Sequence, residues 1–217
     1  MRSIQNKRPG SGFTLVEAMI TLAILGMVTS TVIMALTHRE GSFRVMSRAA
    51  DLEARVRRGI DRVARELLTA GAEQLAPDPT GSFGTSDLLF RNAVGLNGAA
   101  IEWSNQHRIA FEYDTNEVDD GLDNDGDGLV DEGNLVLTRN DGMASEVRVV
   151  LCRGLAEMLE GELPNGVDDN GNGVIDEPGF SVHRVGDVLF LRLTIQESIE
   201  EGVVLTRTLE TSSRLRN

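Results

Sequence analysis

The sequence is poor in the residues on which catalytic and covalent chemistry usually depends. It has one cysteine, Cys152, so no intrachain disulfide can form. Cys152 ends the mostly apolar stretch 147–152, where it is expected as a small strand residue. The alternative is a reactive or intermolecular thiol. The three histidines, His38, His107 and His183, lie far apart, and none stands in a metal-binding or nucleophile motif. No glycine-rich phosphate-binding loop is present either. These absences argue against an enzyme.

An excess of positive charge is also lacking. The chain has 21 Lys and Arg against 34 Asp and Glu, and its net charge is −13. A nucleic-acid-binding protein needs a basic face, so the net charge argues against this class. Eleven of the acids fall in two short stretches, which leaves the rest of the chain at −2. They are Asp119, Asp120, Asp123, Asp125, Asp127, Asp131 and Glu132 in the first stretch, and Asp168, Asp169, Asp176 and Glu177 in the second.

The amino terminus has a basic segment followed by a long apolar run. Residues 1–12 contain no acid, and residues 13–37 contain a single ionisable group, Glu17. These 25 residues exceed the roughly 20 that a helix needs to cross a bilayer. The basic flank favours a cytoplasmic amino terminus, so the chain after about residue 38 is expected to be exported. A cleavable secretory signal would place its small-residue cleavage site after the apolar run, whereas Gly12 precedes it.

Glu17 is the unusual residue in this run. A charge at membrane depth costs about 2.5–3.5 kcal/mol on insertion scales, and such residues usually have a partner and a function. If the chain is cut after Gly12, Phe13 acquires a positively charged amino group, and Glu17 lies one helical turn further on. The two groups would form a natural pair, within one chain or between neighbours. The alternative is a carboxylate that reaches the headgroups and has no role.

The string Gly12-Phe13-Thr14-Leu15-Val16-Glu17 resembles the cleavage and methylation signature of type IV prepilins. This resemblance implies cleavage between Gly12 and Phe13 by a prepilin peptidase, followed by N-methylation of Phe13. It also implies that Glu17 pairs with the amino terminus of a neighbouring pilin or pseudopilin during assembly. The implied location is the bacterial inner membrane, crossed once, with the carboxyl-terminal domain in the periplasm and later in a pilus or pseudopilus.

Helical periodicity continues beyond the membrane run. Gly71 is a plausible helix stop, which predicts one helix of about 55–60 residues, over about 80 Å long. We expect a leader at 1–12, a transmembrane and assembly segment at 13–37, an amphipathic continuation at 38–71 and a linker at 72–86. Arginines fill much of the remaining helix surface, either as a solvated face or as contacts with acidic neighbours. Apolar residues recur at steps of three and four at Phe43, Met46, Ala49, Leu52, Val56, Ile60, Val63 and Leu67.

From residue 87 to 217 the periodicity changes to two, which indicates strands. We predict an α+β fold in which an antiparallel sheet packs against the second half of the long helix. This layout matches the pilin architecture. The segments RVARELLTAG and TRTLETSSRLRN look most like PilW-type minor pilins and the J-type minor pseudopilins of type II secretion. The expected strands are 87–91, 108–113, 134–139, 145–152, 188–196 and 203–210.

The two acidic stretches form an internal repeat, because residues 120–132 align with 165–177 at an offset of 45 without a gap. Calcium prefers six to eight oxygen ligands from a flexible loop. The first loop, 119–133, begins like an EF-hand loop but has Asn134 at the twelfth position. It is more similar to the loops of thrombospondin type 3 repeats. Its expected ligands are the side chains of Asp123, Asp125 and Asp127, the carbonyl of Leu129, and Asp131 or Glu132.

The second loop, 165–178, carries the same pattern with less charge. Asn replaces Asp at two ligand positions, so weaker binding is expected than in the first loop. Magnesium is less suited to such flexible loops. The alternative for both loops is a solvated Asp/Asn/Gly turn without metal. The expected ligands are Asp168, Asn170, Asn172, the carbonyl of Val174, and Asp176 or Glu177.

Two functions are compatible with these features. The first is a minor pilin or pseudopilin, a structural subunit that initiates or caps a type IV pilus or a type II secretion pseudopilus, with loops stabilised by calcium. The second is a calcium-dependent adhesin or binding module displayed at a pilus tip.

Overall fold

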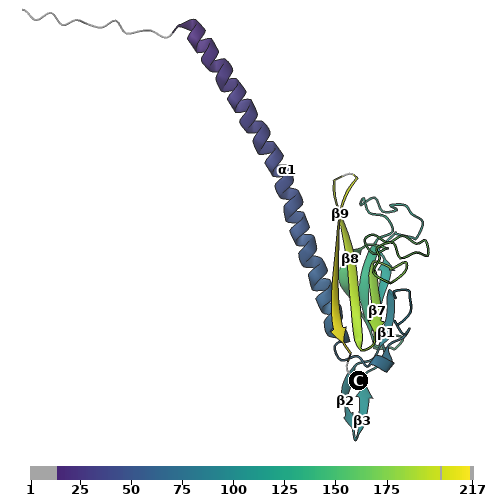
Figure 1. Cartoon of the computed structure of the whole chain (residues 1–217). Helices are drawn as coiled ribbons and strands as arrows, with labels where there is room; N and C mark the ends of the chain where they lie inside the picture. The colour runs from purple at the N-terminus through teal and green to yellow at the C-terminus, as the bar shows by residue number, and fades with distance from the viewer. Residues whose placement is uncertain (1–13, 201, 216–217) are drawn as a thin grey trace, which may run out of the picture. The chain divides into compact units, whose positions relative to one another are not determined.

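A computed structural model describes residues 14–200 and 202–215, leaving out the side chains of residues 35–42 and 200. The chain divides into two compact units, Met1–Ser47 and Arg48–Asn217, and each is described by itself. One α-helix, α1 (Leu15–Leu67), has residues in both units (Figure 1). It has 53 residues, slightly fewer than the sequence predicts.

Thr14 sets the start of α1. Its hydroxyl oxygen accepts a hydrogen bond from the Glu17 amide at 3.2 Å, and its carbonyl accepts one from the Ala18 amide at 3.1 Å. This is a side-chain N-cap, which satisfies an amide that the helix leaves free. Within the apolar run, the Thr21 and Thr29 hydroxyls donate to helix carbonyls four residues earlier, at 2.7 and 2.5 Å. Polar groups in this stretch therefore remain hydrogen-bonded without leaving the helix.

The buried face of α1 lies in the second unit. Leu52, Val56, Ile60, Val63 and Leu67 are all at most 3% exposed and form one side of the domain core. The apolar stripe predicted from the sequence begins earlier, but its first members do not join the core. Phe43 and Met46 are 73% and 71% exposed and belong to the first unit. Periodicity alone could not separate these two parts of the stripe.

Gly59 allows α1 to approach the sheet closely. A Cβ atom added there would lie 3.0 Å from Leu193 Cδ2 and 3.1 Å from Cys152 Cβ. Charged side chains that precede Gly59 in the helix also hold it to the sheet. Glu197 accepts hydrogen bonds from Arg48, at 2.6 Å, and from Arg55. Close backbone approach and ion pairing thus act together at this interface.

Within the described residues, a seven-stranded antiparallel sheet forms the other side of the core, in the order β1-β4-β5-β6-β8-β7, with β9 paired to β8 (Figure 1). Its buried residues include Phe90, Ile109, Leu137, Leu191 and Leu193. The α+β fold predicted from the sequence is confirmed. The strands are β1 (Asp87–Phe90), β4 (His107–Tyr113), β5 (Gly133–Arg139), β6 (Val147–Leu155), β7 (Phe180–Val185), β8 (Val188–Glu200) and β9 (Val203–Arg214).

Three strands lie outside the sequence prediction. β7 pairs with the full first half of β8, and β2 (Ala93–Asn97) and β3 (Ala100–Trp103) form a separate two-stranded hairpin. All residues of β2 are exposed, so this strand lacks the alternation of buried and exposed positions that identifies a strand in a sequence. β7 contains the polar residues Ser181, His183 and Arg184, so its sequence does not have the apolar pattern that predicts a strand.

The segment 72–86, expected as a linker, runs along the sheet. It begins with a 3-10 turn, η1 (Ala72–Gln74), and Ala72 and Leu75 are both 7% exposed. Ala76 exchanges hydrogen bonds with Leu89, at 2.9 and 2.7 Å, and Thr85 does so with Val182, at 3.3 and 3.0 Å. The segment is therefore part of the packed domain.

Candidate functional site

The sheet register places the two acidic loops at one end of the domain. The first loop joins β4 to β5, and the second joins β6 to β7. Tyr113 pairs with Gly133, and Gly133 pairs with Leu155, so the strand ends from which both loops leave are neighbours. Both loops emerge at the same end of the sheet in Figure 1. The repeat in the sequence thus corresponds to two adjacent loops in the structure.

Three exposed carboxylates converge in the first loop. Oxygens of Asp123, Asp125 and Asp127 lie within 4.8 Å of one another. Each side chain also accepts backbone hydrogen bonds from inside the loop: Asp123 from Gly126 and Gly128, at 2.6 and 2.9 Å, Asp125 from Asp127 at 3.0 Å, and Asp127 from Leu129 at 2.9 Å. Calcium–oxygen distances are about 2.3–2.6 Å, so this spacing suits ligands of one ion.

A second acidic group in the same loop is largely buried. It comprises Glu117, Asp125 and Glu132, whose oxygens lie within 4.8 Å of one another, and Asp125 belongs to both groups. Glu117 is 5% exposed and Glu132 is 2% exposed. One oxygen of Glu117 accepts hydrogen bonds from the amides of Asn124 and Asp125, both at 2.9 Å. Among the described residues, the Oε2 atoms of Glu117 and Glu132 have no hydrogen-bond partner.

The surroundings of Glu132 disfavour its ionised form. Burial and the neighbouring negative charges of Asp127, Glu117 and Asp125 raise its pKa to about 7. Glu117 was not among the ligands expected from the sequence. The sequence does contain a sign of its role, because Glu117 and Glu162 also stand 45 residues apart, three positions before the repeat of 120–132 and 165–177 begins.

Asp131, expected as the alternative to Glu132 in the ligand set, lies at the base of the loop. Its carboxylate accepts hydrogen bonds from the amides of Asp120, at 3.2 Å, and Gly121, at 2.8 Å, and so closes the base of the loop. It is grouped with Asp119 and Glu157, not with the three exposed Asp side chains. Burial and the charges of Asp119 and Asp131 raise the pKa of Glu157. Leu129, expected to offer its carbonyl, has its side chain buried at 6% exposure.

The second loop repeats this backbone arrangement. Asp168 accepts hydrogen bonds from the amides of Gly171 and Gly173 at 2.7 and 2.8 Å, and Asn170 accepts one from Asn172 at 3.0 Å. Asn172 accepts from Val174 at 2.9 Å, and Val174 is buried. Asp176 accepts from Asn165 and Gly166 at the base of the loop, as Asp131 does in the first loop. The two loops are therefore structurally equivalent.

The loops differ at their last acid. Glu177, the equivalent of Glu132, is 0% exposed and lies 2.5 Å from the Arg192 guanidinium. It also accepts hydrogen bonds from the Ser181 hydroxyl, at 2.9 Å, and from the Asn172 amide group. Arg192 in turn reaches Glu210 at 2.6 Å. Among the residues that the structure describes, no three acids converge in the second loop.

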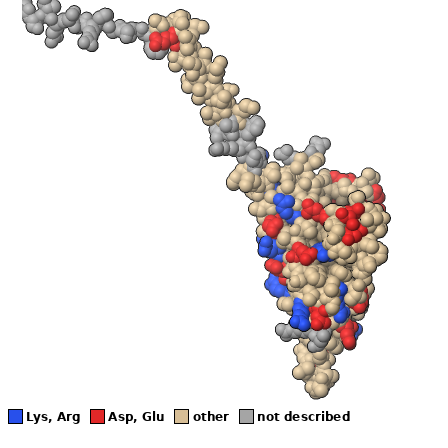
Figure 2. Space-filling view, in the orientation of Figure 1, with Lys and Arg blue, Asp and Glu red and all other residues tan. Residues whose placement is uncertain are grey.

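The amino-terminal candidate site is partly described. Gly12 and Phe13 lie outside the described residues. Glu17 is exposed in the first turn of α1, and its carboxylate has no ion-pair partner within the described ranges. The stretch Leu15–Met34 is long and apolar enough to cross a membrane, with a mean hydropathy of 1.9. The described surface of the first unit carries almost no charge (Figure 2).

Comparison with known protein families gives one match. The family described as the prokaryotic N-terminal methylation motif matches residues 7–33, which include the Gly12–Phe13 junction, Glu17 and most of the apolar run. The chain carries the amino-terminal motif of a type IV prepilin-like protein. No curated protein and no solved structure matches it. The resemblance found in the sequence is confirmed at this level.

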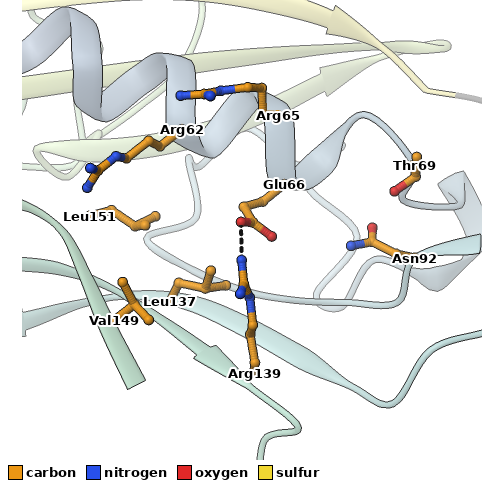
Figure 3. A pocket seen from close by; sticks show the side chains of 9 residues that line it. All are labelled: Arg62, Arg65, Glu66, Thr69, Asn92, Leu137, Arg139, Val149 and Leu151. Atoms are coloured by element: carbon orange, nitrogen blue, oxygen red, sulfur yellow. Dashed lines mark hydrogen bonds and ion pairs between the residues drawn. The ribbon is translucent and has the colours of Figure 1, made fainter. Parts of the chain in front are cut away.

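The prepilin-like protein also has a basic groove between α1 and the sheet. The groove has a volume of about 540 Å³, and in it Arg139 lies 2.5 Å from Glu66 (Figure 3). Arg62 and Arg65 line the α1 side. In a neighbouring hollow, Cys152 is 7% exposed, and burial raises the pKa of its thiol. A buried thiol with a raised pKa is a poor nucleophile, which fits the strand role expected for Cys152.

Proposed function

We propose that this prepilin-like protein is a minor pilin or pseudopilin with a structural, non-enzymatic role. In this account a prepilin peptidase cuts between Gly12 and Phe13 on the cytoplasmic side. The helix then remains in the inner membrane, with the β-rich domain in the periplasm, until the subunit enters a filament. There it helps to initiate or cap a type IV pilus or a type II secretion pseudopilus.

The observation that carries this proposal is the position of Glu17. It is the single ionisable residue in Leu15–Met34, it is exposed, and no described residue neutralises it. Because a lone charge at membrane depth is costly, such a residue usually has a partner. The amino group that cleavage frees on Phe13 of a neighbouring subunit would supply that partner. The match of residues 7–33 to the methylation motif supports the same assembly step.

The test is the abundance of the protein in filaments. Filaments sheared from cells, or pseudopili enriched by pseudopilin overproduction, should contain the mature chain at a small fraction of the major subunit, measured by quantitative mass spectrometry. Crosslinking should connect it to other pilins or pseudopilins. A chain that forms the bulk of the filament would contradict the minor role, and one that stays wholly in the membrane fraction would contradict the filament role.

We further propose that the two loops bind calcium and that the first binds more tightly. The support is the convergence of Asp123, Asp125 and Asp127 at ligand spacing, together with the matching backbone of the second loop. Calcium is scarce in the cytoplasm, so sites in the 10⁻⁴–10⁻³ M range would fill only after export. The full chain in detergent should melt at a higher temperature in calcium than in magnesium or chelator. Identical melts in all three would contradict the proposal.

A calcium-dependent binding module at a filament tip is the second candidate. It is favoured by exposed apolar side chains on the loops. Leu122 and Val167, which are equivalent in the repeat, are 62% and 55% exposed, and Val118 and Leu163 are 52% and 61% exposed. Calcium would order a surface of this kind for contact with a ligand. Binding to a surface ligand without minor-pilin partners would favour this candidate, whereas capture of those partners alone favours the structural role.

A further inference from the structure

Glu132 and Glu177 hold the same position in the repeat but have opposite electrical surroundings. Both are almost completely buried. Glu177 has a guanidinium partner in Arg192 at 2.5 Å. The charged groups that act most strongly on Glu132 are acids: Asp127, Glu117 and Asp125. Within the part of the chain that the structure describes, no positively charged side chain pairs with Glu132 as Arg192 pairs with Glu177.

Glu117 adds a second buried acid to the first loop. Its Oε1 atom accepts hydrogen bonds from two loop amides at 2.9 Å, so the side chain is fixed in place, and its Oε2 atom is buried without a partner among the described residues. Glu162 repeats this arrangement in the second loop, so the contrast between the loops rests on Glu132 and Glu177. The Oε2 atom of Glu132 is likewise buried without a partner among the described residues. Oxygens of Glu117 and Glu132 lie within 4.8 Å of an Asp125 oxygen. Buried carboxylates cost free energy unless they are paired or bind a metal. No Lys, Arg or His among the described residues forms an ion pair with the carboxylate of Glu117 or Glu132.

We propose that Glu117 and Glu132 are the buried ligand arms of a calcium site in the first loop, and that in the second loop Arg192 takes the place of the cation at Glu177. This inference rests on the calcium binding proposed above and specifies it. The protein then has one strong calcium site in the first loop and a weaker site in the second loop.

The ligand set accounts for the choice of ion. Asp125 belongs to both acidic groups of the first loop, so it connects the exposed side chains of Asp123 and Asp127 to the buried pair. Five carboxylates and no nitrogen or sulfur ligand suit a hard divalent cation. Calcium accepts an irregular shell of six to eight oxygens, whereas magnesium demands a near-ideal octahedron and gives up its water reluctantly.

The second loop has fewer free charges for an ion. Asn170 and Asn172 replace two of the Asp ligands, and Glu177 is occupied by three hydrogen-bond partners. Glu162 keeps the role of Glu117 toward the backbone, since it accepts a hydrogen bond from the Asn170 amide at 3.0 Å. Asp168 and Glu162 are then the acids left for an ion, so calcium affinity there is expected to be low.

The experiment compares glutamine variants at the four equivalent positions in the full chain, purified in detergent. Calcium chloride binding is measured by isothermal titration calorimetry, and thermal midpoints are measured in chelator. Glu117→Gln keeps an oxygen for the two amides, so the loop can still fold. We expect Glu117→Gln and Glu132→Gln each to lower affinity at the strong site by roughly tenfold or more, because each removes a charged ligand. Both should also raise the midpoint in chelator.

The matched variants in the second loop should behave differently. Glu162→Gln and Glu177→Gln should leave the strong site unchanged, and Glu177→Gln should lower the midpoint in chelator by breaking the pair with Arg192. If Glu117→Gln and Glu132→Gln bind calcium like the wild type while Asp125→Asn does not, this inference is wrong and calcium binding by the loops stands. If the wild type itself binds no calcium, the proposed calcium function fails. Lower midpoints in chelator with unchanged affinity would assign Glu117 and Glu132 a structural role only.

Discussion

Glu177 and Arg192 form an ion pair at 2.5 Å inside the domain, with side chains 0% and 11% exposed. The pair joins the end of the second acidic loop to the middle of β8. Replacing Arg192 with Met should lower the free energy of unfolding by about 3–5 kcal/mol, because Glu177 would remain buried without a charge partner. Urea denaturation of the detergent-solubilised protein in chelator measures this loss.

An exposed pair provides the control for Arg192. Arg214 lies 3.5 Å from Asp187, but its side chain is 80% exposed. Arg214→Met should change stability by about 0–1 kcal/mol, because surface ion pairs contribute little. If both substitutions lowered the free energy of unfolding equally, burial would not make the Glu177–Arg192 pair more important for stability than the exposed pair.

Asp125 and Asn170 allow a matched test of charge in the two loops. Each accepts one amide hydrogen bond at 3.0 Å, from the residue two positions on, so an alanine removes the same backbone contact in either loop. In chelator, Asp125→Ala should melt at a higher temperature than Asn170→Ala, because it also removes one of the crowded negative charges. In calcium, Asp125→Ala should lose most of the calcium-induced rise and Asn170→Ala much less, as differential scanning fluorimetry would show. A larger loss in Asn170→Ala would reverse the proposed order of affinity.

His107 should make stability depend on pH. Its Nδ1 atom accepts a hydrogen bond from the Asn140 amide at 3.2 Å, and burial and the charge of Arg139 lower its pKa, against an opposing effect of Glu66. The folded state thus holds this side chain neutral, while the unfolded state binds a proton below pH about 6.5. Its contribution to stability should be complete above that pH and decline as pH falls toward the lowered folded pKa.

The measurement is the unfolding free energy from pH 8 to pH 5 at fixed calcium, for the wild type and for His107→Gln. The variant should lose part of the decline below pH 6.5, since glutamine does not titrate. The acidic loops titrate in both proteins, so their contribution to the pH dependence of the unfolding free energy cancels in the comparison. Parallel curves for the two proteins would contradict the role given to His107.

Glu17 should matter for assembly and not for insertion. Glu17→Ala and Glu17→Gln should both enter the membrane, because removing a charge from the apolar run makes insertion easier. Both should be depleted from filaments, since the amino group of the neighbouring subunit loses its partner. Western blots of membrane and sheared-filament fractions measure the two steps separately. Filament levels equal to those of the wild type would remove the assembly role of Glu17.

Much of the fold could be predicted because its signals are local. The residues that resemble a prepilin signature stand side by side at 12–17, and the strong strands β4, β5, β8 and β9 alternate or run apolar over many residues. β2 and β3 gave no such signal, because their side chains face solvent and no alternation results. The exposed part of the apolar stripe, at Phe43 and Met46, has the same spacing as the buried part.

The loops were recognisable from their repeat, but their internal differences were not. Glu117 lies outside the Asp/Gly-rich stretch that drew attention, and its burial depends on the fold around it. The partner of Glu177 is Arg192, 15 residues away on another strand. Only the pairing of β7 with β8 brings that guanidinium to the loop. Spacing within a loop therefore identified candidate ligands, but it could not show that Glu177 is already paired with the guanidinium of Arg192.

The most direct test of the prepilin-like account is the intact mass of the native protein. It should be purified from the membranes of a cell that has a prepilin peptidase and measured by mass spectrometry. The account predicts a mature chain that begins at Phe13, has lost residues 1–12 and carries one added methyl group. A protein that retains Met1, or one cut near residue 37, would contradict it.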